Sequence, residues 1–196
     1  MTSILKVDTL QNSLGEDILK NGYPTKPGQI IEYLASPCDG SIVKVLSGEY
    51  TFQNVNGIQV LSTTYSDVLG SLITYTPPVG TRQVIYKYVS TMGWEHDHAI
   101  THWKLFIDND EVLFARFSRS GRYPEDRVEF EWVINIGGTA DLNTGRQSIW
   151  DIPKTLKMQA RWYGTSNARN LHGTHYWDGA GGVHFSMPAL TIITLA

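Results

Sequence analysis

Two segments with a regular alternation of apolar and polar residues place the strongest constraint on the fold. Apolar side chains occupy every second position of residues 128–136 and again of residues 156–162, mostly with charged or amide residues between them. Successive side chains of a β-strand point to opposite faces of the sheet, so each segment is predicted to bury one face and expose the other. Neither pattern fits a helix, which has a period of 3.6 residues.

Four further segments have the composition of strands, at residues 29–34, 84–88, 104–117 and 190–195. The third contains Asp108-Asn-Asp between two apolar runs, which is typical of a hairpin turn. No stretch of a dozen residues shows a helical period, and the 18 glycines and 8 prolines favour tight turns. The sequence therefore predicts an all-β fold, a jelly-roll-like two-sheet β-sandwich of roughly eight to ten strands.

The first 26 residues differ from the rest of the chain. They are polar, they are interrupted by glycine and proline, and they are too few to bury a core. We therefore expect an extended N-terminal arm and linker at residues 1–26 and one β-sandwich domain at residues 27–196. A chain of 196 residues with 41% hydrophobic content is long enough for one such core.

Composition argues against several classes of function. The formal net charge is −3 and no basic stripe is present, so nucleic-acid binding is not expected. No apolar run approaches the roughly 18 residues that cross a bilayer, and residues 1–19 do not follow the order of a signal peptide. We expect no membrane insertion, and synthesis in the cytoplasm. The single cysteine, Cys38, is predicted to be a buried, unreactive thiol in a turn at residues 36–40.

The arm contains a strand-like segment that needs a binding partner. Residues 4–10 have apolar side chains on both faces, and a lone strand of this length is not stable in water. The arm therefore indicates a component of a larger assembly. The residues expected to attach it are Ile4, Leu5, Lys6, Val7, Asp8, Leu10 and Gln11.

The run Ser3-Ile-Leu-Lys-Val-Asp-Thr-Leu-Gln, followed by Gly15, resembles the N-terminal signature of structural proteins from tailed phages, chiefly phages of marine bacteria and cyanobacteria. Residues 62–77 resemble a strand pair common in phage fibre modules of this kind, and residues 83–86 resemble the strand that follows it. Thr81-Arg82 stands where such proteins usually have a Ser/Asn-Lys pair. The resemblance implies a trimeric fibre, knob or decoration that is attached to the virion by its first residues.

Three histidines form a candidate metal site. His96, His98 and His102 share parity, so a continuous strand would point all three to one face, a spacing that suits Zn²⁺, Fe or Ni²⁺. The run partly resembles the first cupin motif, which implies a metalloenzyme, but His102 replaces the Glu of that motif and no second motif follows. In a homotrimer the same strands could surround one ion on the threefold axis. We expect the simpler alternative, surface histidines hydrogen-bonded to Glu95 and Asp97 without a cofactor.

A glycine-rich aromatic stretch at residues 163–182 is a candidate receptor-binding loop. Aromatic faces stack on sugar rings, and amide or carboxylate groups hydrogen-bond sugar hydroxyls. The candidate glycan contacts are Asn167, Asn170, Tyr176, Trp177 and Asp178. The alternative is a loop whose aromatic residues contact a neighbouring subunit. Glu129 and Glu131 would share the outer face of one strand, so we expect a solvated face there and not a catalytic pair.

These observations predict a non-enzymatic structural protein of a phage virion, made in the host cytoplasm. The chain would be a homotrimeric tail-fibre or receptor-binding module that is attached to the particle through its arm. The expected partners are further copies of the chain, other virion proteins of the tail or capsid, and a host surface glycan. Outward apolar residues such as Val133 would be covered by neighbouring copies. A capsid decoration protein, a knob or cement, is the alternative, and a cupin-like metalloenzyme is a more distant one.

Overall fold

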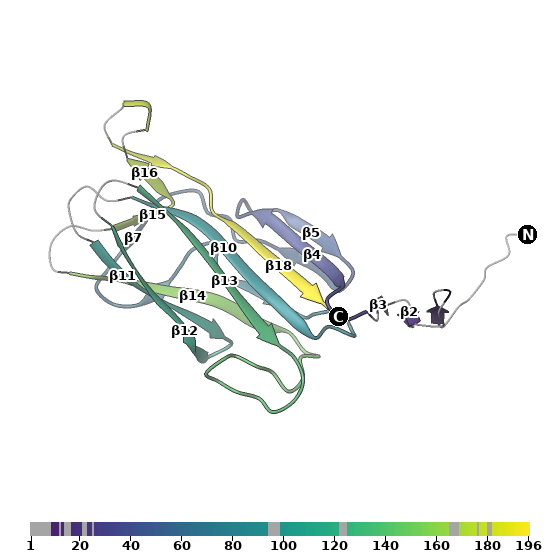
Figure 1. Cartoon of the computed structure of the whole chain (residues 1–196). Helices are drawn as coiled ribbons and strands as arrows, with labels where there is room; N and C mark the ends of the chain where they lie inside the picture. The colour runs from purple at the N-terminus through teal and green to yellow at the C-terminus, as the bar shows by residue number, and fades with distance from the viewer. Residues whose placement is uncertain are drawn as a thin grey trace, which may run out of the picture.

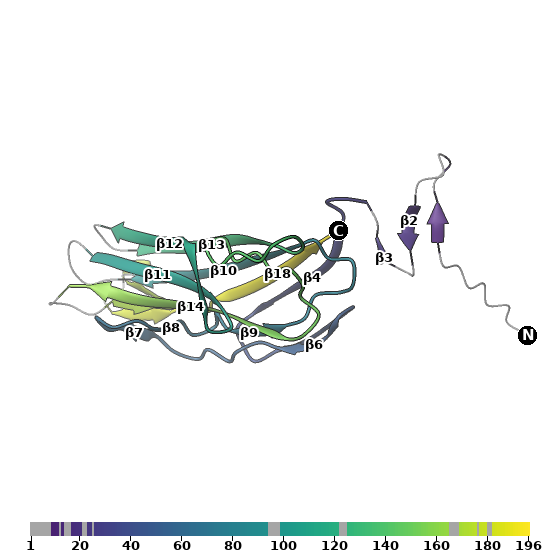
Figure 2. The same ribbon diagram turned by 90° about the horizontal axis from the view of Figure 1, so that it is seen from below.

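The fold is an all-β sandwich, as predicted. In the computed structural model, two antiparallel sheets face each other and enclose the core (Figure 1, Figure 2). The structure describes residues 9–11, 13, 17–20, 23–24, 26–93, 99–121, 125–164, 169–175, 177–179 and 182–196.

The larger sheet has six strands. They are β4 (Ile30–Pro37), β18 (Ala189–Leu195), β10 (Gln83–Gly93), β13 (Glu125–Asn135), β15 (Arg169–Leu171) and β7 (Gln59–Leu61). The central strand is β10, which pairs with β13 on one edge and with β18 and β15 on the other. Beyond these, β4 pairs with β18, and β7 pairs with β15.

The smaller sheet has five strands. They are β12 (Asp110–Gly121), β11 (Ala99–Ile107), β14 (Lys154–Tyr163), β8 (Ser66–Asp67) and β9 (Ile73–Tyr75). The strand β11 lies between β12 and β14, and the short strands β8 and β9 both pair with the other edge of β14.

Shorter elements complete the described chain. They are the pairs β5 (Ile42–Val45) with β6 (Gly48–Thr51) and β16 (Gly173–His175) with β17 (Val183–Phe185), the three strands β1 (Thr9–Gln11), β2 (Asp17–Lys20) and β3 (Tyr23–Pro24), and the 3-10 turn η1 (Trp177–Gly179). Within the described residues, no helix is long and apolar enough to cross a membrane.

The two alternating segments form β13 and β14, and their predicted orientation is confirmed. On β13, Val128 is fully buried while Glu129 and Glu131 are exposed. On β14, Leu156 and Met158 are fully buried. The inward side chains of both strands therefore form part of the core. The outward side chains are not needed for the core and can serve in binding.

The other predicted strands are present as β4, β10 and β18, and the predicted hairpin joins β11 to β12. At its turn, Asp108 has a left-handed backbone with φ of 54°, and its Oδ1 accepts a 2.8 Å hydrogen bond from the Thr155 N–H. After the turn the β11–β12 register shifts, and Phe114 of β12 is left 66% exposed.

An aromatic stack joins the two sheets through the core. Trp103 of β11 stacks on Phe117 of β12, with ring centroids 5.5 Å apart, and Phe117 stacks on Phe130 of β13 at 5.4 Å. Tyr86 and Tyr88 of β10 are also fully buried, and each hydroxyl donates to a backbone carbonyl. Both sheets therefore depend on one shared core.

Cys38 is fully buried, as predicted, and its Sγ lies 3.1 Å from the Gly70 carbonyl oxygen. Burial raises the pKa of the thiol to about 12, with a smaller contribution from the neighbouring Asp39 carboxylate. The thiolate, which is the reactive form, is therefore absent at neutral pH. The expected tight turn is replaced by a longer strand: β4 continues to Pro37, and Asp39 forms a β-bridge with Asn54.

Glu32 of β4 is a buried carboxylate. It accepts hydrogen bonds from the Ser47 N–H at 2.7 Å, from the Ser47 hydroxyl at 2.8 Å and from the Tyr75 hydroxyl. These three donors offset the loss of hydration that a buried charge suffers. Because Glu32 and Leu34 point into the sandwich, Tyr33 between them points outward and is 59% exposed.

The sandwich has two different ends. The ends of β10, β12 and β14 and the starts of β11 and β13 lie together at one end, which we call the distal end. The opposite, proximal end holds the start of β4 and the end of β18, where the Gly28 N–H donates to the Ala196 carbonyl at 2.8 Å. In Figure 1 the C-terminus lies at the proximal end and β16 at the distal end.

Strands β1, β2 and β3 lie outside the sandwich, beyond its proximal end (Figure 2). They form a small antiparallel sheet in which Leu10 is opposite Leu19. Two predicted attachment residues, Leu10 and Gln11, belong to β1. The others, which lie outside the described residues, are Ile4, Leu5, Lys6, Val7 and Asp8. The division of the chain at residue 26 stays a prediction.

Candidate functional site

Two stretches that are far apart in the sequence meet at the distal end. Gly93, which precedes the histidine stretch, pairs with Asn170 of the aromatic stretch through β10 and β15. On the neighbouring sheet, the His102 ring lies 5.6 Å from the Tyr163 ring. The candidate metal residues and the candidate glycan residues that the structure describes therefore belong to one region.

A buried histidine supports this end from inside. His172 is fully buried, its backbone φ is 61°, and its Nδ1 lies 2.8 Å from the Ser90 hydroxyl. Its Nε2 has no hydrogen-bond partner among the described residues. Burial lowers the pKa of His172 to about 4, because the imidazolium form cannot be hydrated there. His172 is therefore neutral at pH 7.

Close packing also fixes the chain around Gly93. A Cβ atom at this position would lie 2.6 Å from His175 Cδ2 and 3.0 Å from the Gly173 carbonyl oxygen, so only glycine fits without a shift. Nearby, Arg169 is buried, and its guanidinium carbon lies 5.6 Å from the Trp162 ring. Burial lowers the pKa of Arg169, although the group remains charged.

The accessible part of the region is the outer face of the five-stranded sheet. Register places Arg161 of β14 opposite His102 of β11, and His102 opposite Ser118 of β12. Tyr65 and Tyr163 flank this row: the Arg161 guanidinium carbon lies 5.2 Å from the Tyr65 ring and 5.9 Å from the Tyr163 ring. We call these five residues the Arg161 face.

A pocket of about 270 Å³ opens on this face. Its lining residues are Tyr65, His102, Trp103, Arg116, Phe117 and Ser118. Trp103 and Phe117 belong to the core stack, so the floor of the pocket is apolar and rigid. The rim carries a hydroxyl, an imidazole and a guanidinium group, which suits a small polar ligand.

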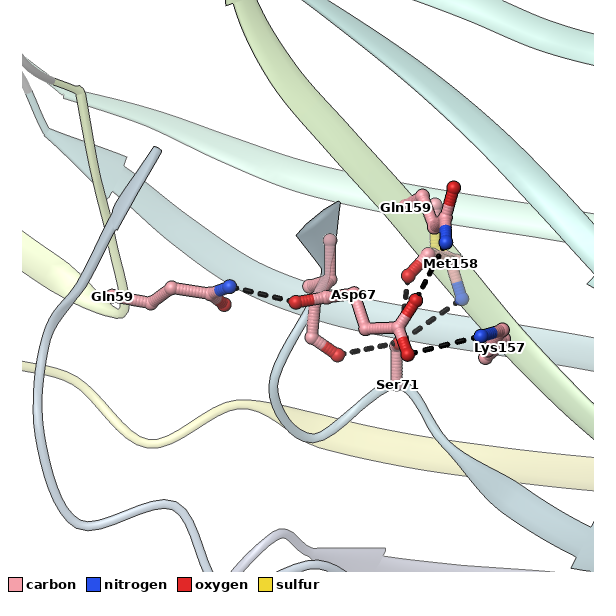
Figure 3. A network of polar contacts seen from close by, with 7 residues as sticks. Gln59, Asp67, Ser71, Lys157, Met158 and Gln159 are labelled. Carbon is pink, nitrogen blue, oxygen red and sulfur yellow. Dashed lines mark hydrogen bonds and ion pairs between the residues drawn. The ribbon is translucent and has the colours of Figure 1, made fainter. Parts of the chain in front are cut away.

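A network of polar contacts holds the segment that carries Tyr65 against β14 (Figure 3). The Asp67 carboxylate accepts hydrogen bonds from Lys157 Nζ at 3.0 Å and from Gln159 Nε2 at 2.7 Å. Gln59 Nε2 donates to the Asp67 backbone carbonyl at 2.7 Å. Burial alone would raise the pKa of Asp67, but the hydrogen bonds from Gln159 and Lys157 outweigh it, and the pKa is lowered.

Ser71 completes the same network (Figure 3). Its hydroxyl donates to the Val68 carbonyl at 2.6 Å and accepts from the Met158 N–H at 3.0 Å. This side chain thus takes the place of a strand partner for β14 between β8 and β9. The residues that follow Tyr65 in the chain are therefore held to β14 by several hydrogen bonds, and these bonds set the position of Tyr65.

The cations on this side of the sheet are not equally neutralised. Glu111 accepts from Lys104 Nζ at 3.0 Å and from Arg116 Nε, and the bond from Arg116 is the main reason that the pKa of Glu111 is lowered. Lys104 also lies 4.3 Å from the centre of the Tyr65 ring. The guanidinium group of Arg161, by contrast, has no ion pair and no hydrogen bond within the described residues.

The metal prediction falls partly outside the structure. His96 and His98 lie outside the described residues, and His102 contacts the Tyr163 ring. Within the described residues, no group of three or more His, Cys, Asp or Glu side chains could hold a metal ion. A metal site at these histidines stays a prediction.

The predicted glycan contacts are also only partly described. Asn170 is half-buried in β15, Trp177 begins η1, and Asp178 is exposed with a φ of 51°. Asn167 and Tyr176 lie outside the described residues. Sugar binding by this loop is still untested.

Arg161 and Ser118 belong to none of the motifs discussed above, whereas Tyr65 lies in the stretch at residues 62–77 that resembles a strand pair of phage fibre modules. The one available signal was the outward position of Arg161 in the alternating segment at residues 156–162. Its neighbours come from other strands, and their register cannot be read from local periodicity.

Comparison with known proteins adds little. No family model and no curated protein matches the chain. Among solved structures, a chain in the structure of infectious bursal disease virus Gx strain is similar over 83% of this chain and 46% of that chain, with 12% identity and a TM-score of 0.26. This chain thus spans less than half the length of that one, and a TM-score this low does not establish a shared fold.

Proposed function

We propose that the chain is a non-enzymatic structural protein of a tailed-phage particle, a homotrimeric module of tail-fibre or receptor-binding type. The observation that carries this proposal is the two-ended organisation of the molecule. The arm, whose sequence resembles the attachment segment of phage structural proteins, leads into the proximal end of the sandwich. The Arg161 face extends to the distal end, beside the candidate receptor loop. The proposal thus assigns attachment and host contact to opposite ends of the sandwich.

A row of apolar side chains supports self-assembly. Across the outer face of the six-stranded sheet, register places Tyr33 opposite Ile193, Ile193 opposite Ile85, and Ile85 opposite Val133. We call these four residues the apolar row. Tyr33 is 59% and Val133 is 40% exposed, so the row meets water in the single chain. A continuous apolar strip of this kind is typical of a protein contact surface.

A second copy of the chain is the partner that fits this face best. In the adjacent cross-strand row, Lys87 lies opposite Glu131, and the two side chains form a 3.6 Å ion pair. Their charges cancel, so two copies of the face would not repel each other. In a cyclic trimer the neighbour contact is heterologous, and the apolar row of each chain would be covered where the three copies of this face converge on the threefold axis.

The polar groups of the region favour binding over catalysis. Ser90 and His172 form the described pair that most resembles a nucleophile and its base, but both are buried, so a substrate could not reach them. Glu129 and Glu131 are exposed on one strand face, and each is paired with a cation, Arg127 and Lys87 respectively. Neither pair has the geometry of an active site.

Deletion of residues 1–19 tests the attachment role of the arm. The proposal expects the shortened protein to keep the thermal stability and the trimeric mass of the full chain but to be missing from purified particles. The full-length chain, produced beside it, should be incorporated. Incorporation of both proteins would contradict the proposal. Cryo-electron microscopy of particles that carry the full chain should place it on the tail, and a position on the capsid would favour a decoration protein instead.

A further inference from the structure

The Arg161 face has the chemistry of an anion-dependent sugar site. We infer that it binds a saccharide that carries a carboxylate or sulfate group, with Arg161 as the partner of the anion and Tyr163 as the surface on which the sugar ring stacks. The inference rests on the proposed host-binding function. It assigns a ligand class to the Arg161 face, which is separate from the predicted glycan contacts.

The first argument is the state of Arg161. Its guanidinium is half-buried between two tyrosine rings, at 5.2 and 5.9 Å, and has no carboxylate partner in the described part of the chain. Its Nε is buried without a hydrogen-bond partner among the described residues. A guanidinium group that is already held in place loses less conformational freedom when it pairs with a carboxylate or sulfate. Arg161 is therefore prepared for an anion that the described protein does not supply.

The second argument is the position of Tyr163. This residue is 61% exposed on the outer face of β14, so its ring is not needed in the core. It lies beside the His102 ring and close to the Arg161 guanidinium. Aromatic faces next to a polar group are suited to sugars, which have one apolar face and a polar edge.

The third argument is the pocket. It adjoins Arg161 through two of its lining residues, His102, which lies opposite Arg161, and Tyr65, whose ring lies 5.2 Å from the guanidinium carbon. At about 270 Å³ the pocket is slightly smaller than most small-molecule sites. Ser118 and His102 in its lining offer hydrogen-bond donors and acceptors for hydroxyl groups, while Phe117 supplies an apolar floor. This space suits one sugar ring at the end of a chain.

The fourth argument is charge. Lys104, Arg116, Lys157 and Arg161 share the outer face of this sheet with two carboxylates, those of Glu111 and Asp67, while the whole chain has a net charge of −3. The face is therefore locally positive on an acidic protein. Such a field attracts acidic polysaccharides from solution and weakens with added salt.

The test compares four purified full-length proteins on immobilised oligosaccharides: the wild type, Arg161→Gln, Tyr163→Ala and the matched control Arg127→Gln. Arg127 is an exposed arginine on the outer face of the other sheet and is paired with Glu129. The probes are a uronate oligomer, a sulfated oligosaccharide and a neutral glucan. Thermal unfolding of each variant checks that its fold is intact.

We expect the wild type to bind at least one acidic probe and not the neutral glucan, with affinity that falls as salt rises. Arg161→Gln and Tyr163→Ala should each weaken binding about tenfold or more, whereas Arg127→Gln should stay within about twofold. The acidic probe that binds identifies carboxylate or sulfate as the recognised group. Equal binding of neutral and acidic probes, unchanged binding by Arg161→Gln, or no binding at all would overturn the inference.

Failure of the sugar site can be distinguished from failure of the proposed function. Arm deletion tests particle attachment without touching the Arg161 face. If the shortened protein is still incorporated and Arg161-dependent binding is found, the proposed attachment through the arm fails and the sugar site stands. If the arm is required but no acidic sugar binds, the site fails and the virion proposal stands.

Discussion

The outer faces of the two sheets are built by the same alternation but present opposite chemistry. On the six-stranded sheet, the outward positions carry the apolar row, with Tyr33 at one end and Val133 at the other. On the five-stranded sheet, the outward positions of β11 and β14 include His102, Arg161 and Tyr163. Inward side chains are mostly apolar in both sheets, so the fold does not decide this difference.

The comparison separates what the fold needs from what the function uses. Burial of the inward residues stabilises either sheet, whatever lies on the outside. Outward residues are then free to specialise, one face for contact with copies of the chain and the other for a ligand. The two faces should depend on each other through the shared core and should otherwise be separable by substitution.

The largest effect is expected from the core that the faces share. Trp103→Ala removes the centre of the stack with Phe117 and should lower the free energy of unfolding by about 3–5 kcal/mol in urea denaturation. Both sugar binding and self-assembly should then fail together. Phe114→Ala is the control, because this ring is 66% exposed, and its loss should change stability by less than about 0.5 kcal/mol. Equal effects of the two substitutions would show that the stack does not hold the faces together.

The next effect is acid sensitivity at the distal end. His172 has a pKa of about 4 in the folded protein and 6.5 as a free side chain, so the unfolded state takes up the proton first as the pH falls. Stability should therefore drop by about 3 kcal/mol between pH 6.5 and pH 4 on account of this residue. The comparison is His172→Asn, since asparagine tolerates the left-handed backbone at this position. Denaturant midpoints measured at several pH values should fall less steeply for the variant, and parallel curves would contradict the assignment.

A smaller loss is expected from Gly93→Ala. The added methyl group would meet His175 at 2.6 Å, so the β16 strand must shift, at about 1–3 kcal/mol. Gly57→Ala is the control, because its Cβ would meet nothing within 4 Å. Thermal unfolding should show the difference. A variant at Gly93 as stable as the control would mean that the distal end is packed less tightly than the structure shows.

The smallest effect on stability is expected from Asp67→Ala. It removes the bonds to Lys157 and Gln159, which are partly solvated, so the loss should be about 1 kcal/mol or less. Tyr65 should nevertheless become less ordered, because the network of Figure 3 holds its segment to β14. Acidic-sugar affinity should therefore drop while the mass of the assembly stays the same. Asp151→Ala, an exposed residue elsewhere, should change neither.

Sequence patterns predicted the strands because burial of one face imposes a period that is visible in a single segment. Residues 128–136 and 156–162 show this directly. The burial of Cys38 was predicted because it is the single cysteine of the chain and no activating group lies next to it in the sequence. Glu32 shows where such reasoning stops. A glutamate between apolar residues indicates an outward position, but Ser47 and Tyr75 supply the hydrogen bonds that let it turn inward.

The candidate site was harder to predict because it is assembled from separate strands. Tyr65 reaches Arg161 only through the pairing of β8 with β14, and Gly93 reaches Asn170 only through β10 and β15. Long-range register of this kind leaves no local period in the sequence. The apolar row was visible only as Val133, for the same reason.

The central claim is that the outer face of the six-stranded sheet contacts other copies of the chain and that of the five-stranded sheet does not. The mass of the assembly in solution tests this claim most directly. Light scattering of the full-length wild type should give three times the chain mass of 22.0 kDa, and Ile193→Glu, in the apolar row, should reduce it to that of one chain. Ile100→Glu makes the same change on the outer face of β11 and should leave the trimer intact. A wild type that is a stable monomer, or a trimer that survives Ile193→Glu but not Ile100→Glu, would contradict the account.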